Sequence, residues 1–261
     1  MRIIKLFSAL LKMNFQMVLA YRADTVANII TNLFWLGWDL LSLQIIFTNT
    51  TSLSGWGLGD LIALLGVFRL ANTLMMTLIW PNTERFNASI RDGSFDYTLL
   101  QPINSQFLTS FTRIAIWRVW EVGLSAALII IGINLSERVT TPLDVLSFLA
   151  LTFAGATVIY SLWIVLIAFT FWFVKFDNNV TILQALMDAG RYPASVYPTW
   201  LRYLITFVIP IAVATTVPVQ ALRGDLSGWQ VLMYLGIAAA SLVISGRVWS
   251  SGVKRYSSAS S

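Results

Sequence analysis

WPNTERFNASIRDGSFDYTLLQPINS, residues 80–105, is a charged segment between two strongly apolar regions of the chain. It carries five charged residues within 13 positions, namely Glu84, Arg85, Arg91, Asp92 and Asp96. Apolar side chains lie among the charges, and Phe86 and Ile90 are four residues apart, so both face one side of a helix. The pattern predicts a short helix, a turn at Gly93 and a second amphipathic turn that stops before Pro102. This is more elaborate than a plain connection requires, and we interpret it as a docking surface.

The composition around this segment belongs to a membrane protein. Of 261 residues, 57% are apolar and 11% are charged, and the mean hydropathy is +0.74. Soluble domains carry about 25% charged and about 45–50% apolar residues. A soluble fold of this composition would expose large apolar patches, so we predict an integral membrane protein. The chain has no Cys and no His, which excludes disulfides, thiol catalysis, Cys/His metal sites and His-based triads.

Long apolar segments predict one all-α domain over residues 1–261 with six transmembrane helices. The predicted spans are 26–47, 60–80, 106–133, 145–174, 203–222 and 229–248. Residues 1–22 place basic and apolar side chains on opposite faces, which predicts an interfacial amphipathic helix. The alternative is that they begin the first spanning helix. Pro210 and Pro218 interrupt the fifth span and predict either a broken outer segment at 210–228 or a plain proline kink.

The basic residues are distributed asymmetrically among these segments. With the N-terminus inside, fourteen of the 17 Lys and Arg residues lie on inner segments or in the inner half of the third span. Only Arg138 and Arg223 lie outside. The positive-inside rule therefore places both termini, the loop 81–105 and a second polar loop at 175–202 in the cytoplasm. The net charge of +5 reflects topology and attraction to membrane lipids, and nucleic-acid binding is excluded.

Asp39, Arg69 and Glu121 fall inside predicted apolar spans. Asp39 and Arg69 lie on neighbouring antiparallel helices at similar depth, where an ion pair would offset the cost of an intramembrane charge, about 2.5–3.5 kcal/mol. The pair either lines a path or gate, together with Pro210 and Pro218, or is a structural tether. Glu121 follows Arg118 by three residues, which predicts an intrahelical pair.

The sequence lacks the common nucleotide-binding, catalytic and metal-binding motifs. It contains no G-x-x-x-x-G-K-[ST] loop for a nucleotide, no G-x-S-x-G, no H-E-x-x-H and no closely spaced carboxylates for a metal. We therefore predict a non-catalytic chain without a metal site, whose energy comes from a partner.

Three stretches carry a resemblance to a known family. The segment IRDGSFDYTLLQPIN is similar to the cytoplasmic G-x-h-D-x-x-L-L-x-P signature of type-2, export-type ATP-binding cassette (ABC) permeases, in a group long labelled an uncharacterised transport system. The match continues in ALMDAGRYPASVYPTWLRYLITFVIPIAVATTVPVQALRG and in the tail at residues 256–261. The resemblance covers most of the chain.

The resemblance implies a type-2 ABC permease architecture in the cell (inner) membrane of a bacterium. Two permease chains, identical or paralogous, would flank the path, and two separate ATPase subunits would bind ATP and Mg. The coupling region that contacts the ATPase would include Gly93, Asp96, Leu99, Leu100 and Pro102, and we add Glu84, Arg85, Arg91 and Asp92 from the same segment. Phe86, Phe95 and Tyr97 are the predicted anchors of this contact, because aromatic residues dominate interface energetics.

The sequence is also compatible with two other functions. The chain could be an ATP-independent secondary carrier or channel that uses Asp39 and Arg69, with residues 81–105 as a plain connection. It could also be a membrane assembly factor without transport. The sequence does not identify the cargo.

Overall fold

The computed structural model describes residues 22–136, 138–173 and 178–256. This part of the chain consists of helices and turns, and it contains no strand. Nearly all of the predicted interfacial helix 1–22 lies outside the described residues, as do Lys175 and the end of the tail.

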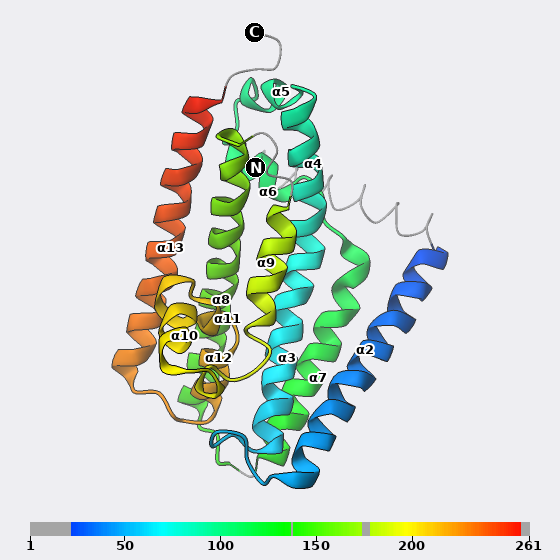
Figure 1. Ribbon diagram of the computed structural model, residues 1–261, viewed down its shortest axis with the longest axis vertical. Helices are drawn as coiled ribbons and strands as arrows, with labels where there is room; N and C mark the ends of the chain where they lie inside the picture. The colour runs from blue at the N-terminus through cyan, green and yellow to red at the C-terminus, as the bar shows by residue number, and fades with distance from the viewer. Residues whose placement is uncertain (1–21, 137, 174–177, 257–261) are drawn as a thin grey trace.

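Five helices in the described residues are long and apolar enough to cross a membrane. Their main parts are α2 (Arg22–Asn49), α3 (Leu58–Leu74), α7 (Val119–Leu135), α8 (Pro142–Ala168) and α13 (Gly228–Arg255). Figure 1 shows them running roughly parallel to the long axis. One end of the bundle carries α4, α5 and the last turn of α13, and we call it the elbow end; the opposite, loop end carries the connections 50–57 and 223–227. The all-α membrane class is confirmed, whereas the count of six spans is not.

Small residues allow α3 and α7 to approach closely. A Cβ atom added to Gly59 would lie 2.6 Å from the carbonyl oxygen of Gly132, and one added to Gly66 would lie 2.9 Å from the backbone nitrogen of Ile129. Both distances are shorter than van der Waals contact. Since lipid supplies no hydrophobic drive between helices, close backbone contact of this kind holds the pair together.

The second long helix continues past the apolar span without a break. After α3 come a π-helical turn, η1 (Met75–Ile79), and α4 (Trp80–Arg91). The 34 residues from Leu58 to Arg91 are about 50 Å long. A π turn leaves a carbonyl out of the regular ladder, and here Thr77 O accepts a hydrogen bond from Ala115 N at 2.8 Å.

The third span differs from its predicted bounds. The prediction that it starts at Gln106 is wrong, because α6 (Ser105–Phe111) is a separate short helix and the spanning part begins at η2 (Ile116–Arg118). The side chain of Asn82 binds the backbone at this break. Its Nδ2 donates to the carbonyl oxygens of Ser110 and Arg113, at 3.0 and 2.6 Å, and its Oδ1 accepts from Arg113 N at 2.9 Å.

The segment after residue 178 differs most from expectation. Residues 175–202 are predicted as a cytoplasmic loop, but α9 (Asn179–Asp188) enters the bundle from the elbow end and buries Leu183 and Met187. Gly190 then packs against Thr215 and Ile211. Arg191 is thereby removed from the inner loops to which the charge count assigned it.

The predicted fifth span, 203–222, for which the prolines predict a broken segment or a kink, is interrupted rather than only kinked. It divides into the end of α10 (Thr199–Tyr203), a π turn η5 (Leu204–Val208), α11 (Ile211–Ala214) and α12 (Thr216–Leu222). Pro210 ends the π turn, and its backbone is not helical. After α12, the Arg223 guanidinium lies 4.3 Å from the centre of the Trp56 ring and 3.6 Å from the Asp60 carboxylate, which places it at the loop end.

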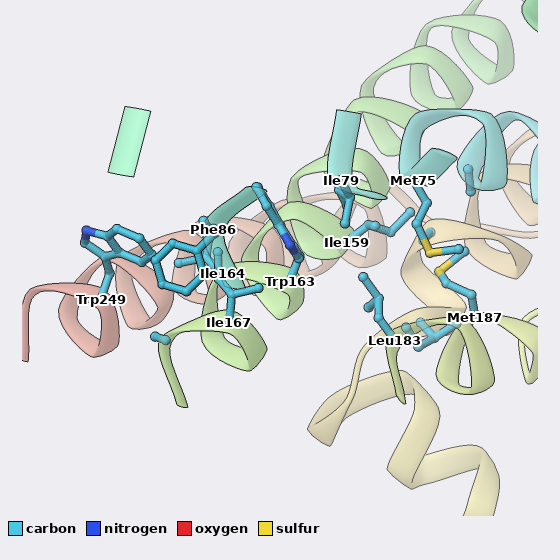
Figure 2. Packing of buried hydrophobic residues seen from close by; sticks show 14 of the residues in the cluster. Met75, Ile79, Phe86, Ile159, Trp163, Ile164, Ile167, Leu183, Met187 and Trp249 are labelled. Carbon is cyan, nitrogen blue, oxygen red and sulfur yellow. The ribbon is translucent and has the colours of Figure 1, made fainter. Parts of the chain in front are cut away.

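The largest core cluster lies in the elbow half of the bundle. Figure 2 shows Met75, Ile79 and Phe86 of the long helix packed against Trp163 of α8, Leu183 and Met187 of α9, and Trp249 of α13. Several buried polar groups in the same region are paired. The indole nitrogen of Trp163 donates to Thr83 Oγ1 at 2.7 Å, and the side-chain amides of Asn87 and Asn179 exchange hydrogen bonds.

Candidate functional site

The elbow, residues 80–105, consists of α4, α5 (Phe95–Leu99) and the turns that follow them. Its position is set by an aromatic cluster, which comprises Phe86, Phe95, Phe171, Trp249 and Tyr256. The Phe86 ring centre lies 5.4 Å from that of Phe95 and 5.5 Å from that of Phe171, both edge-on. The same ring lies 5.6 Å from Trp249. These contacts attach the elbow to the ends of α8 and α13.

The turn between α4 and α5 forms as predicted at Gly93. Gly93 has a φ of +75°, a left-handed conformation that glycine adopts without steric cost. Asp92 supports the turn, because its Oδ1 accepts a hydrogen bond from Ser94 N at 2.9 Å. The side-chain and backbone hydrogen bonds of Ser94 hold the pKa of Asp92 below its usual range.

The predicted coupling residues divide by exposure. Exposed positions are Glu84, Arg85, Arg91, Asp92, Tyr97, Leu99, Leu100 and Pro102; Gly93 and Asp96 are partly buried, and Phe86 and Phe95 are buried. Phe86 is 2% exposed and Phe95 is 1% exposed. The prediction that these two rings anchor a partner is therefore corrected, since they pack into the core and position the elbow.

What the elbow offers to a partner is an apolar tip beside a polar groove. Tyr97 is 73% exposed and Leu100 is 81% exposed. The adjoining groove has a volume of about 630 Å³, and Glu84, Arg85 and Asp92 line it. Exposed apolar side chains next to charged ones are typical of a protein interface.

A second site lies within the spanning part of the bundle. The predicted pair of Asp39 and Arg69 forms, with 2.7 Å between Asp39 Oδ2 and Arg69 Nη2. A third residue joins it, because Arg191 Nη1 lies 3.3 Å from Asp39 Oδ1. The Arg191 guanidinium also lies 5.4 Å from the centre of the Phe68 ring. Sequence reasoning missed Arg191, whose partner is 152 positions away.

The predicted Arg118–Glu121 pair also forms, at 2.8 Å. Its carboxylate has two further partners. Thr73 Oγ1 of α3 donates to Glu121 Oε2 at 3.1 Å, and Asn32 Nδ2 of α2 donates to Oε1 at 3.3 Å. The pair therefore connects three helices.

These charged groups surround one cavity of about 350 Å³ between α2, α3, α7 and α9, which we call the polar cavity. Its lining includes Asn32, Trp35, Asp39, Arg69, Glu121 and Arg191. Two buried atoms in its wall, Arg69 Nε and Asn72 Oδ1, have no hydrogen-bond partner within the described residues. Pro210 and Pro218 are buried elsewhere and do not line the cavity. The prediction that they join Asp39 and Arg69 in one path is not supported by this geometry.

No group of three or more acidic side chains that could hold a metal ion occurs in the described ranges. The arrangement offers ion pairs, hydrogen-bond donors and an exposed apolar tip, and none of the predicted site residues forms a nucleophile–base pair.

A family model described as ABC-2 family transporter protein matches the chain over residues 33–260. The match includes the elbow and all residues of the polar cavity named above except Asn32. Neither the curated proteins nor the solved structures contain a match to the chain.

Proposed function

The chain belongs to the ABC-2 family of transporter proteins, and from that premise we propose that it is the permease subunit of an ATP-driven exporter. Two copies, or one copy and a paralogue, would form the membrane path. Two separate ATPase subunits would dock at the elbow end and bind ATP and Mg. In this arrangement the elbow end faces the cytoplasm, in the cell (inner) membrane.

The observation that supports this proposal is the mechanical continuity of the elbow. The exposed tip at Tyr97 and Leu100 is attached through Phe86 and Phe95 to α8 and α13, and through α4 to the long helix. A push on the tip therefore moves several spanning helices together. Closure of an ATPase dimer can shift the bundle only if the open and the closed dimer bind the elbow differently. A rigid attachment then passes the displacement of the elbow on to the spanning helices, which coupling requires.

Replacement of the tip tests the proposal. We expect Tyr97→Ala with Leu100→Ala to fold normally, because both side chains are exposed, but to lose the copurifying ATPase or its transport-linked ATP hydrolysis. A matched control is Tyr203→Ala with Leu232→Ala, which removes an exposed Tyr and an exposed Leu outside the elbow. Equal ATPase retention and coupling in both variants would contradict the proposal.

The polar cavity favours a second candidate function, an ATP-independent carrier or channel that uses Asp39 and Arg69. Reconstitution of the chain alone into vesicles separates the two candidates. Solute flux that persists without any ATPase subunit and disappears in Asp39→Asn would support the carrier. Flux that requires an ATPase subunit would support the exporter.

A further inference from the structure

We propose that the polar cavity binds the oxyanion group, a phosphate or carboxylate, of the transported molecule. That the bound molecule is transported rests on the proposed export function. The binding site itself is argued from the chain alone. A volume of about 350 Å³ accommodates an anionic headgroup and falls at the lower end of ligand pockets, about 300–1,000 Å³.

The hydrogen-bonding groups around the cavity are unbalanced in favour of donors. Three guanidinium groups line it, those of Arg69, Arg118 and Arg191, against the two carboxylates of Asp39 and Glu121. A guanidinium carries five N–H donors and no acceptor. Because Arg69 Nε is buried and has no partner among the described residues, the wall retains donor capacity that the carboxylates do not use. Asn72 Oδ1 is also without a partner in the described ranges and can take one donor, so a ligand that matches this wall brings chiefly acceptors.

Arg191 is the arginine best placed to meet such a ligand. Its side chain is 44% exposed, whereas that of Arg69 is 13% exposed and is held directly by Asp39. The contact from Arg191 to Asp39, at 3.3 Å, is longer than the one from Arg69, at 2.7 Å. Asp188 also lies 3.8 Å from Arg191, but its side chain is 56% exposed and is outside the cavity lining. An entering oxyanion can therefore contact Arg191 while the Asp39–Arg69 pair stays intact.

The remaining lining suits a polar group attached to a larger molecule. Amide side chains of Asn32 and Gln184 and the ring of Trp35 surround the charges. Trp35 is 56% exposed, so the cavity is open beside α2. Two sources can supply the oxyanion: the headgroup of an anionic lipid or a small anion from solution. Both sources present the same oxyanion chemistry to Arg191, and the experiment distinguishes them.

Binding is measured on the purified full-length chain in neutral detergent by native mass spectrometry and thermal unfolding. The probes are phosphatidylglycerol, inorganic phosphate and acetate, with diacylglycerol as the matched lipid without an oxyanion. The test variant is Arg191→Gln, and Arg191→Lys keeps the charge. The control is Arg247→Gln, which removes an exposed arginine of α13 outside the cavity.

We expect at least one anionic probe to bind the unaltered chain and the Arg247→Gln variant equally. Arg191→Gln should weaken that binding on the order of tenfold, and Arg191→Lys should restore part of it. If the binding that depends on Arg191 is that of phosphatidylglycerol, and neither phosphate nor acetate competes with it, the site binds a lipid headgroup. If only phosphate or acetate shows binding that depends on Arg191, the site binds a soluble anion.

The inference is overturned if every probe binds Arg191→Gln as well as it binds the unaltered chain. It is also overturned if diacylglycerol binds as well as phosphatidylglycerol. Equal thermal unfolding of Arg191→Gln and Arg247→Gln shows that a lost signal is not a folding defect. The assay needs no ATPase subunit, so its failure is distinguishable from failure of the exporter proposal, which the elbow variants test separately.

Discussion

The elbow and the polar cavity are built on the same continuous helix, yet they are constructed in opposite ways. The elbow half is closed by rings and branched side chains, and Phe86, Phe95 and Trp163 are at most 2% exposed. The cavity half is lined by ion pairs and amides around an open volume of about 350 Å³. The π turn at residues 75–79 lies where the two halves meet: Met75 is fully buried in the core, and Met76 lines the cavity.

This difference separates two tasks within one helix. A closely packed interior resists deformation and transmits displacement, so the elbow suits the transfer of motion from a partner. A cavity walled by paired charges can admit water or a polar ligand at smaller cost, because its charges already have counterions. Mutations in the two halves should therefore differ in what they damage.

The largest effect is expected from Phe95→Ala in the elbow. The ring is 1% exposed and contacts Phe86, Phe171 and Tyr256, so its removal leaves a cavity that the neighbours cannot easily fill. Loss of a buried Phe costs about 3–5 kcal/mol. Thermal unfolding in detergent measures this loss, and Phe34→Ala, at a ring that is 66% exposed, is the matched control. Similar melting of the two variants would show that the elbow is not closely packed.

A smaller effect is expected from Asp39→Asn in the cavity. The change leaves Arg69 and Arg191 without their shared carboxylate. Loss of one partner of a fully buried pair costs about 3–5 kcal/mol, but this cavity is open and Arg191 is 44% exposed, so we expect roughly 2 kcal/mol. Unfolding of Asp39→Asn is compared with that of Asp188→Asn, whose side chain is 56% exposed.

A double variant sharpens this result. Asp39→Asn with Arg69→Gln should recover part of the lost stability, because no unpaired charge is then held at the Asp39–Arg69 contact. If the double variant unfolds as the sum of the single ones, the two residues do not interact and the description of the cavity wall fails.

Substitution at the turn comes next in size. Gly93→Ala places a side chain at a φ of +75°, which costs about 1–2 kcal/mol. The strain lies next to the docking tip, so we expect weakened ATPase coupling in addition to the stability loss. Gly224→Ala, at a φ of +70° near the loop end, should cause a similar stability loss with coupling retained. Equal coupling in both variants would remove the elbow from the mechanism.

The comparison also shows which features the sequence could predict. The Gly93 turn follows from local chemistry, and the Asp39–Arg69 pair follows from two intramembrane charges at similar depth on neighbouring helices. Both depend on short-range or depth information. The long charged segment predicts an elbow for the same reason, because charge and proline interrupt a run of apolar residues.

What could not be predicted depends on long-range contacts. Phe86 and Phe95 look like exposed anchors in a polar segment, and only Phe171 and Trp249, more than 70 positions later, show that they are buried. The helix at Asn179–Asp188 has ten residues with polar ends, so its pattern resembles a loop. The sequence pattern therefore places Arg191 in that loop, although its carboxylate partner lies in the first spanning helix.

The smallest predicted effect concerns the pH response of the elbow turn. Folding lowers the pKa of Asp92 below the usual 3.8 through the hydrogen bonds of Ser94, so the carboxylate form stabilises the turn. That contribution is present above pH 3.8 and is lost as the pH falls through the lower folded value. Because Asp92 is exposed to solvent, the effect should be confined to the turn. We expect amide hydrogen exchange at residues 93–97, corrected for its intrinsic pH dependence, to accelerate on acidification below that value. Asp92→Asn cannot gain or lose this charge, so its corrected exchange should not change over the same interval. An identical acid response of the turn in both proteins would mean that the titration of Asp92 does not control it. The polar cavity is the internal control: Asp92 does not line it, so amide exchange around the cavity should respond equally to acid in the two proteins.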